Sequence, residues 1–373
     1  MVFDNESKDL TQDEKFDVAI IGGGPAGCAT ALSLLKYGYS VVIMEKTDYN
    51  NLRVGEILPP KIQVPLSYLG IWKKFLNENN SSPSFTILSS WGKKELHENN
   101  FIFNPFGKGW HVNRCQFDAF LAHASESAGS RLYLKAKLVS FNLEDNNWKL
   151  KVACDNKLYH FKSRFLIDAT GHQSAISLQF NANKIVHDKL IGIVCYLSPN
   201  SKMTSDNHLL IEAAECGWWY SAILPDQNIV VAYMTDADIY KHGIKKSTTF
   251  WNDELQKTIH TKSRLSSYPT QYILNVYSAS SFHLDKVSGK GWLAVGDAAI
   301  AFDPLSSQGV WKSLQTGIHA AEAIKKYLEN KENPLEEYST WINKIFCNYL
   351  LERQKFYSSE KRWPDSDFWK RRN

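Results

Sequence analysis

Gly22-Gly23-Gly24-Pro25-Ala26-Gly27 is the stretch that decides the fold of this chain, because of what stands on either side of it. The apolar run Phe16–Ile21 comes directly before it. Good helix formers follow from Ala26 to Tyr37, and a second apolar run, Val41–Met44, ends at Glu45. This order predicts a strand, a helix and a second strand, which together form a βαβ unit.

The glycine spacing within that stretch is typical of dinucleotide binding. Gly22 permits a tight turn, Gly24 lets the backbone approach a pyrophosphate, and Gly27 lets the helix pack against the sheet. The start of the helix presents free N–H groups and partial positive charge to phosphates. Glu45 closes the second strand, where an acid can bind the ribose hydroxyls of an adenosine. Cys28, just inside the helix, is predicted to be a small packing residue and not a nucleophile.

A second motif near the other end of the chain favours FAD over NAD as the dinucleotide. Gly296-Asp297 follows the apolar run 291–295, and Pro304–Val310 then opens a predicted helix over 309–328. The aspartate is expected to accept hydrogen bonds from ribityl hydroxyls. The start of the helix is expected to face the pyrimidine edge of a flavin, where negative charge accumulates on reduction. An ordinary Gly-Asp turn is the alternative, and the joint occurrence of both motifs argues against it.

Composition excludes several other classes of protein. Hydrophobic residues make up 43% of the 373 residues and charged residues 22%, a globular composition with enough chain for two domains. A net charge of +4 gives no argument for nucleic acid, and no apolar run is long enough to span a membrane. The six cysteines lack CxxC spacing and the eleven histidines lack HExxH, so no metal is expected. A polar, acidic start with no secretory signal, read as a disordered lead-in over 1–14, predicts a cytoplasmic protein.

The rest of the chain yields coarser predictions. Residues 49–83 are expected to be irregular, and 84–110 and 187–275 to form half-buried strands. A helix is expected over 114–128, a strand over 165–168 that ends in a turn, and a helix pair over 334–356. The tail 361–373 is expected to be a solvated end, in preference to a partner-binding segment.

Together these elements predict an α/β protein with a Rossmann-like FAD-binding domain, a smaller sheet-rich substrate domain and C-terminal helices. Each domain is expected to be discontinuous in sequence. The predicted segments are 15–83, 109–180 and 277–331 for the FAD-binding domain, 84–108 and 181–276 for the substrate domain, and 332–373 for the C-terminal helical segment and tail.

The sequence resembles the FAD-dependent monooxygenase and halogenase superfamily with the para-hydroxybenzoate hydroxylase fold. The resemblance covers about 16–328 and is carried by 22–27, Glu45, 55–60, 114–118, 168–171, 296–297 and 303–309. It implies that Arg114 reaches the adenosine diphosphate part of FAD, although a surface residue at a helix start is the alternative. The residues that it implies for FAD binding are Gly22, Gly24, Pro25, Ala26, Gly27, Glu45, Lys46, Arg53, Arg114, Val139, Asp168, Gly171, Asp297, Pro304, Ser307, Gln308, Gly309 and Val310.

Within the superfamily the sequence resembles the family of small flavoproteins that includes LodB, GoxB and QhpG. The similar segments are Gly217–Pro225, Tyr233–Asp238 and Asp303–Gly309. This resemblance implies hydroxylation of a tryptophan in a precursor protein during biogenesis of a tryptophylquinone, such as cysteine tryptophylquinone. Two other functions stay open: a non-catalytic FAD-containing chaperone for the precursor, and a small-molecule monooxygenase or halogenase.

Two positions argue against a tryptophan halogenase. Those enzymes carry a lysine in a Ser-Phe-Lys context, where this chain has Ser84-Phe85-Thr86, and a glutamate in Pro-Leu-Glu-Ser, where this chain has Ser306. A hydroxyl group cannot supply the same charge at neutral pH. The chain shows no second GxGxxG for a nicotinamide. The reductant is therefore expected to come from a separate flavin reductase, from weakly bound NAD(P)H or from the substrate protein.

Few side chains are candidates for the chemistry itself. Glu56, in a Gly-Glu-x-x-Pro-Pro turn, is the candidate catalytic residue, and a structural turn carboxylate is the alternative. His172 is expected to be a lone surface histidine. Trp218 and Trp219 are candidates for the substrate face, and because neighbouring residues in a strand point oppositely, at most one can face a flavin.

Overall fold

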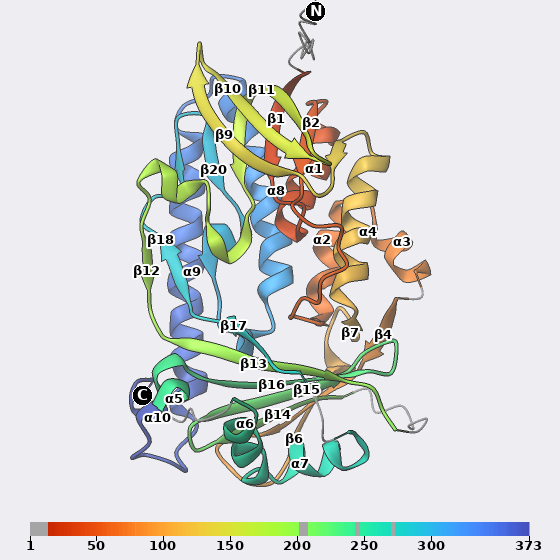
Figure 1. Ribbon diagram of the computed structural model, residues 1–373, viewed down its shortest axis with the longest axis vertical. Helices are drawn as coiled ribbons and strands as arrows, with labels where there is room; N and C mark the ends of the chain where they lie inside the picture. The colour runs from red at the N-terminus through yellow and green to blue at the C-terminus, as the bar shows by residue number, and fades with distance from the viewer. Residues whose placement is uncertain (1–13, 79, 201–207, 243–246, 270–272, 373) are drawn as a thin grey trace, which may run out of the picture.

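The protein is described by a computed structural model that covers residues 14–372 apart from 79, 201–207, 243–246 and 270–272. Two large sheets dominate it, one in the upper and one in the lower part of Figure 1. The lead-in predicted over 1–14 lies outside the described residues except for Glu14, which begins the first strand.

The first sheet has eight strands and a parallel centre, in the order β19-β20-β11-β1-β2-β8, with β10 and β9 added beside β11. Its strands are β1 (Glu14–Ile21), β2 (Val41–Met44), β8 (Arg131–Tyr133), β9 (Lys137–Glu144), β10 (Asn147–Cys154), β11 (Lys157–Asp168), β19 (Ser288–Gly289) and β20 (Trp292–Ala294). Ile21 pairs with both Met44 and Asp168, and Asp168 pairs with Ala294. The carboxyl ends of four strands therefore meet at one edge, where ligands bind in open α/β sheets.

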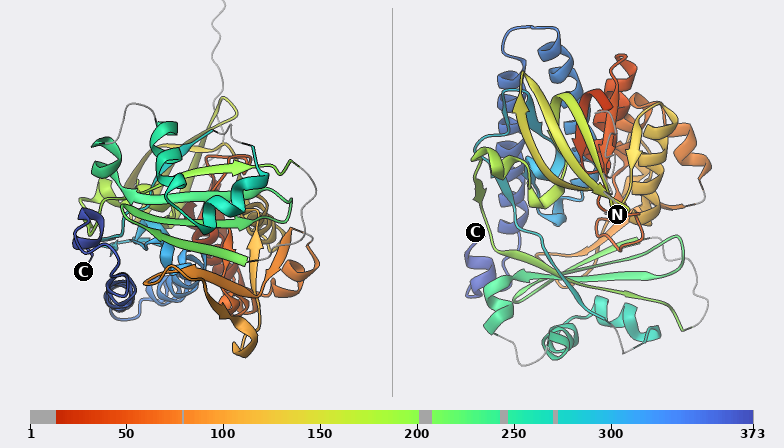
Figure 2. Two further views of the ribbon diagram at one scale, coloured as in Figure 1. Left: turned by 90° about the horizontal axis from the view of Figure 1, so that it is seen from below. Right: turned by 45° about the horizontal axis from the view of Figure 1, so that its top comes forward.

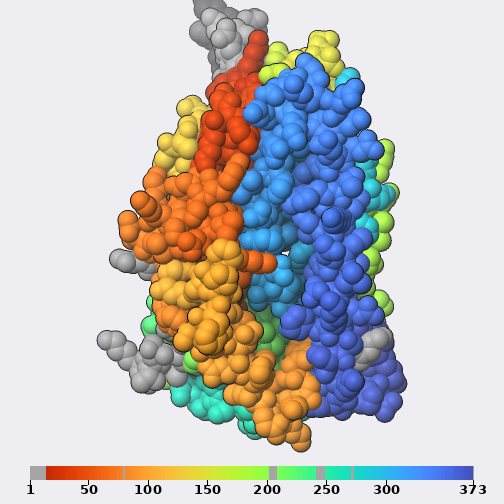
Figure 3. All heavy atoms as spheres, turned by 180° about the vertical axis from the view of Figure 1, so that it is seen from behind, coloured from red at the N-terminus to blue at the C-terminus, as the bar shows by residue number. Residues whose placement is uncertain are grey.

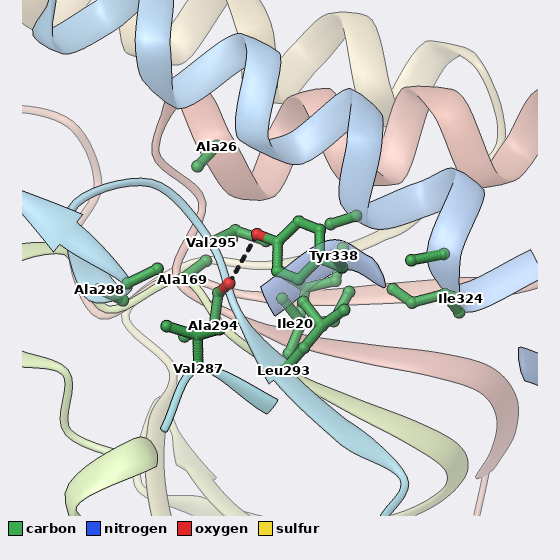
Figure 4. Packing of buried hydrophobic residues seen from close by; sticks show 14 of the residues in the cluster. Ile20, Ala26, Ala169, Val287, Leu293, Ala294, Val295, Ala298, Ile324 and Tyr338 are labelled. Atoms are coloured by element: carbon green, nitrogen blue, oxygen red, sulfur yellow. Dashed lines mark hydrogen bonds between the residues drawn. The ribbon is translucent and has the colours of Figure 1, made fainter. Parts of the chain in front are cut away.

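Helices cover one face of this sheet. They are α1 (Pro25–Lys36), α4 (Arg114–Ser127), α8 (Gly309–Leu328) and α9 (Pro334–Ser358). α1 and α8 touch closely, since a Cβ atom on Gly317 would lie 2.4 Å from the carbonyl oxygen of Ala26. α9 is tied to the sheet by Tyr338, whose hydroxyl donates to the carbonyl oxygen of Ala294 at 2.8 Å (Figure 4). The apolar side chains of α1, α8 and α9 thus share one core with β1, β11 and β20.

The opposite face of the first sheet is covered by the twisted β9–β10 extension. Trp148 and Trp292 are buried there, and Phe180 stacks on Trp292 with ring centroids 4.6 Å apart. The strands of the parallel centre are therefore buried on both faces, which explains their continuous apolar runs.

The second sheet has seven strands and lies below the first in Figure 1 and in the right view of Figure 2. Its order is β17 (Asn275–Ser278), β13 (Leu190–Leu197), β16 (Ile229–Asp236), β15 (Gly217–Ile223), β14 (His208–Ala214), β5 (Thr86–Ser90) and β6 (His97–Asn100). Helices α6 (Ser247–Gln256) and α7 (His260–Arg264) lie on its far side, and α5 (Ala237–His242) follows β16. The expectation of half-buried strands is wrong for β15 and β16, which are buried along their whole length.

The segment 49–83 is not irregular, contrary to the prediction. It contains β3 (Ile57–Leu58), α2 (Gln63–Tyr68), α3 (Trp72–Asn77) and β4 (Ser81–Ser84). β3 and β4 pair with β7 (Gly109–Val112) in a small sheet, and β12 (Lys184–Val186), β18 (Phe282–Leu284) and β21 (Ile300–Ala301) form another. Single 3-10 turns are η1 (Pro60–Ile62), η2 (Phe101–Phe103), η3 (Gly171–Gln173), η4 (Ser177–Phe180), η5 (Leu265–Ser267), η6 (Gly296–Ala298) and η7 (Pro304–Ser306).

The C-terminal region also differs from its prediction. The expected helix pair is the single helix α9, which runs beside α8 along one side of the molecule (Figure 3). The tail is not a solvated end, because α10 (Asp367–Lys370) buries Phe368 and Trp369 against the second sheet. Arg372 pairs with Asp236 at 2.5 Å inside this contact. None of the helices in the described residues is long and apolar enough to cross a membrane.

Candidate functional site

A cavity of about 770 Å³ is lined by residues of both sheets, and most of the predicted site residues meet in it. Its volume is in the range of small-molecule and cofactor sites. The predicted residues that line it are Gly22, Gly24, Pro25, Ala26, Glu45, Lys46, Arg53, Glu56, Arg114, Val139, Gly171, Asp297, Pro304, Ser307, Gly309 and Val310. The cavity thus joins segments from residue 22 to residue 310.

The glycine turn has the geometry that a pyrophosphate needs. Gly22 has a φ of +111°, and a Cβ atom there would lie 2.2 Å from the carbonyl oxygen of Ala169. A Cβ atom on Gly27 would lie 2.1 Å from the carbonyl oxygen of Gly22, so Gly27 serves helix packing and does not line the cavity. A Cβ atom on Gly24 would meet nothing within 4 Å. No side chain caps the first turn of α1, so its N–H groups are available to an anion.

Glu45 lies beside this turn and holds it in place. Its Oε2 accepts from the N–H of Gly23 at 2.8 Å, and its Oε1 accepts from the hydroxyl of Thr47 at 2.6 Å. Arg53 donates to the same Oε1 at 3.3 Å and pairs with Asp118 at 2.9 Å. Since each carboxylate oxygen can accept more than one hydrogen bond, Glu45 can still bind a ribose, and that role stays a prediction.

Arg114 lies at the start of α4 and is not a surface residue, so the alternative interpretation of Arg114 is wrong. Its Nη1 donates to the carbonyl oxygen of Val54 at 2.6 Å, and its Nε donates to Asp118 at 3.2 Å. Its side chain is largely buried and lines the cavity beside Val54 and Gly55. A fixed guanidinium in this position suits a phosphate, as the resemblance implies.

Asp168 and Gln308 do not line the cavity, so the prediction of direct contact with the cofactor is revised for both. Asp168 is fully buried and accepts hydrogen bonds from the backbone and hydroxyl of Thr170 and of Ser177. It therefore shapes the turn whose later residue, Gly171, does line the cavity. Gln308 accepts a hydrogen bond from Lys61 at 3.2 Å.

Asp297 lines the cavity, as predicted, and is paired with a residue that the sequence analysis missed. That residue is Lys312, a buried lysine on α8 whose Nζ donates to the Asp297 carboxylate and to the carbonyl oxygen of Ile300. The loss of bulk water inside the cavity acts to raise the pKa of Asp297, but the charge and hydrogen bond of Lys312, with the charge of Arg114 and the effect of His172, hold this pKa below its ordinary value. Asp297 therefore faces the cavity as a carboxylate.

Glu56 lies where the cofactor-binding segments meet the second sheet, and only 1% of it is exposed. It accepts hydrogen bonds from Tyr196 at 2.6 Å and from the N–H of Gly55 at 2.8 Å, and the Tyr220 hydroxyl lies 3.5 Å away. Burial raises the pKa of Glu56, against the hydrogen bonds and the charge of Arg114. Tyr196 was missed by the sequence analysis, and Tyr220 is part of the Gly217–Pro225 segment that it singled out.

Of the two neighbouring tryptophans, only Trp218 lines the cavity, as the strand geometry required. Its Nε1 donates to the hydroxyl of Tyr357 at 3.0 Å. Trp219 lies on the far face of the sheet, stacked on Tyr233 with centroids 4.5 Å apart and packed against Trp251.

His172 is not a lone surface residue, contrary to expectation. It lines the cavity next to Gly171, and its Nε2 lies 3.1 Å from the carbonyl oxygen of Ser280. Its ring packs edge-on against Phe282. Its place in the turn after β11, which Asp168 shapes, brings it beside the cofactor-binding segments.

The two positions compared with halogenases stay outside the cavity. Thr86 is 2% exposed, and its hydroxyl lies 3.4 Å from Glu98. The Ser306 hydroxyl donates to the carbonyl oxygen of Asp303 at 2.9 Å. Neither lines the cavity, so neither substitutes for the lysine or the glutamate of those enzymes. Among the residues that the structure describes, no group of three or more His, Cys, Asp or Glu could hold a metal ion.

Comparison with known proteins identifies the family of the chain. The FAD binding domain family model matches residues 15–345. LodB of Marinomonas mediterranea, which bears the name of an FAD-dependent oxidoreductase, is 29% identical, and the match covers 96% of this chain and 97% of LodB. The myxobacterial FAD-dependent halogenase CndH matches in structure with a TM-score of 0.88 and 21% identity, over 96% of this chain and 86% of CndH. QhpG, described as a peptidyl tryptophan dihydroxylase essential for tryptophylquinone cofactor biogenesis, has a TM-score of 0.80 and 19% identity, over 96% of this chain and 78% of QhpG.

The chain belongs to the FAD binding domain family, and it is an FAD-dependent oxidoreductase. The predictions of an α/β fold and of FAD as the cofactor are thereby confirmed. The residue-level assignments to FAD rest on the geometry of the cavity alone and stay predictions.

Proposed function

We propose that this FAD-dependent oxidoreductase hydroxylates a tryptophan side chain of a partner precursor protein, as a step in tryptophylquinone cofactor biogenesis. The observation that carries the proposal is the composition of the cavity at the second sheet. The walls there are apolar and aromatic, formed by Val194, Leu209, Ile211, Trp218 and Met234. Such walls suit a flat apolar ring such as indole and keep water away from it.

Glu56 is the group that we assign to proton transfer. Bound FAD, once reduced, supplies the activation of oxygen. An aromatic carbon that gains a hydroxyl group must release a proton, and a nearby carboxylate can accept it. A raised pKa makes Glu56 a stronger base than an ordinary carboxylate, and the Tyr220 hydroxyl on the cavity wall can pass the proton on to it.

The likeness in fold to QhpG supports a substrate that is part of a protein. The match to LodB extends over almost the full length of both chains. QhpG, which shares the fold, is described as acting on a peptidyl tryptophan. The absence of a lysine at position 86 and of a glutamate at position 306 removes the charged groups that would favour halogenation.

The test is to express a candidate precursor with and without this protein and to measure the mass of the peptide that contains its tryptophan. We expect the peptide to gain oxygen only when FAD-loaded protein is present. Glu56→Gln should slow the gain while FAD stays bound. A precursor that is modified equally well without this protein would contradict the proposal.

A second arm distinguishes the chaperone function and the source of electrons. Gly24→Val protein, which should lack FAD, is co-expressed in the same way. Full modification in its presence would favour a chaperone that needs no cofactor. Purified components then show whether a separate flavin reductase with NADH must be added before oxygen is incorporated.

A further inference from the structure

Lys312 is a lysine with almost no contact with solvent. It lies in the first turn of α8 and is 1% exposed, and it does not line the cavity. Lysine is rarely buried unless its charge is paired. An isolated ammonium group loses more free energy on leaving water than it regains from contacts inside the protein. The buried ammonium group of Lys312 is therefore expected to have an oppositely charged partner.

The ammonium group of Lys312 is held from several sides. Nζ donates to the Asp297 carboxylate and, at 2.5 Å, to the carbonyl oxygen of Ile300. The ring of Phe302 lies with its centroid 5.0 Å from Nζ. An ammonium has three N–H groups, and these contacts account for them. Lys312 is thus a fixed charge behind the cavity wall.

Asp297 lies between the ammonium group of Lys312 and the cavity. Its side chain is 43% exposed and lines the cavity, whereas Lys312 lies behind it. The Oδ1 atom accepts the hydrogen bond of Lys312. Among the described residues, none donates a hydrogen bond to Oδ2, so that oxygen is available to a ligand.

We propose that Lys312 is a positioning residue for FAD, which holds the Asp297 carboxylate in place and balances its charge, so that the second oxygen accepts hydrogen bonds from the hydroxyl groups of the cofactor. The proposal depends on FAD binding and not on the nature of the substrate. Three side chains act on Asp297 from different elements: Lys312 on α8, His172 on η3 and Arg114 on α4. Of these, Lys312 is the only one for which a hydrogen bond to Asp297 is found among the described residues.

The test compares Lys312→Met with the wild type by the dissociation constant of FAD, measured from flavin fluorescence over pH 5 to 8. We expect FAD to bind about ten-fold more weakly, because a charge-assisted hydrogen bond no longer orders Asp297. The difference should widen as the pH falls. Without the charge of Lys312, Asp297 takes up a proton at a higher pH and loses an acceptor.

A double-mutant cycle with Asp297→Asn separates positioning from a general loss of packing. In the Asp297→Asn background, Lys312→Met should weaken FAD binding by less than two-fold. Lys326→Met, at a partly exposed position on the same helix, is the matched control and should leave the dissociation constant unchanged. The pH series is repeated with His172→Gln, because His172 also acts on Asp297.

Three results would overturn the proposal: an unchanged dissociation constant in Lys312→Met, a loss that is the same at every pH, or a loss of the same size in the Asp297→Asn background. Lys312→Gln, which keeps a donor for Ile300 without the charge, replaces Lys312→Met should the latter not fold. Lys312→Arg keeps the charge and should retain most of the affinity.

Discussion

The three glycines of the first turn have different neighbours, and this makes one of them a clean probe of FAD binding. A Cβ atom on Gly22 or Gly27 would collide with a backbone oxygen, at 2.2 Å and 2.1 Å, whereas one on Gly24 would meet nothing within 4 Å. We predict that Gly24→Val folds normally but loses non-covalently bound FAD, because the new side chain fills the space for the pyrophosphate. The measurement is the flavin released on heating per mole of protein, with the melting temperature as the check on folding.

Gly27→Val is the contrasting variant at this site. Its Cβ atom would lie 2.1 Å from the carbonyl oxygen of Gly22, so it should lose stability as well as FAD. A normal flavin content in Gly24→Val would mean that the cofactor is held elsewhere. Flavin that remains attached to the chain after heating would contradict non-covalent binding.

The burial of Glu56 should be visible in the pH dependence of stability. Burial raises its pKa above the ordinary value of 4.5, so the unfolded chain ionises Glu56 at a lower pH than the folded protein does. The wild type should therefore lose stability relative to Glu56→Gln as the pH rises from about 4.5 to the folded-state pKa. The free energy of unfolding should fall by up to about 1.4 kcal/mol for each pH unit in that window.

Urea denaturation of both proteins at equal flavin content, at several pH values from 4.5 to 8, measures this difference. Glutamine has one acceptor oxygen where glutamate has two, so Glu56→Gln loses a hydrogen bond from Tyr196 or from the N–H of Gly55, and this lowers its stability by an amount that does not depend on pH. Plots of the free energy of unfolding against pH that stay parallel for the two proteins would show that the surroundings of Glu56 do not raise its pKa.

At the scale of elements, α9 supports the loop that precedes α8 and lines the cavity. The hydroxyl of Tyr357 donates to Asp303 at 2.7 Å and accepts from Trp218 at 3.0 Å, so one side chain joins α9, the loop and the second sheet. Tyr357→Phe leaves two buried polar groups short of a partner, and we predict a loss of about 1–3 kcal/mol in the free energy of unfolding.

Tyr327→Phe on α8 is the control for this loss, since its hydroxyl makes no hydrogen bond with a described residue. It should leave stability within about 0.5 kcal/mol of the wild type. Equal losses in the two variants would mean that the hydroxyl of Tyr357 contributes nothing specific. Urea unfolding followed by tryptophan fluorescence and by circular dichroism gives both values.

The elements that the sequence predicted well are those with a local signal. The βαβ unit is marked by its glycines and apolar runs, and α8 begins at Gly309 and ends at Leu328 as expected. The prediction for the tail was wrong because the tail is buried through contacts that are distant in sequence, such as the ion pair between Arg372 and Asp236 on β16. Lys312 was missed because a lysine in a helix normally marks the exposed face, and its partner Asp297 belongs to another element.

At the scale of the whole molecule, the cavity forms only because two sheets meet, and this decides which side chains can act together. Residues close to the flavin motif in sequence need not lie in the cavity: Ser306 and Gln308 do not, although Ser307 between them does. Spacing along the chain could therefore predict the cofactor but not the full set of lining residues, because Tyr220 and His172 come from other segments.

The same arrangement predicts that the protein does not halogenate free tryptophan. A halogenase needs an amine to carry the activated halogen and a carboxylate nearby. This chain has Thr86 and Ser306 at the positions compared with those two groups, and both residues lie outside the cavity. The protein is mixed with reduced FAD, oxygen, bromide and tryptophan, and the products are searched for the isotope pair of bromine. A tryptophan halogenase assayed in parallel shows that the mixture supports the reaction. We expect no brominated product. Formation of many molecules of brominated tryptophan per molecule of protein would show that a different side chain of the cavity carries the halogen.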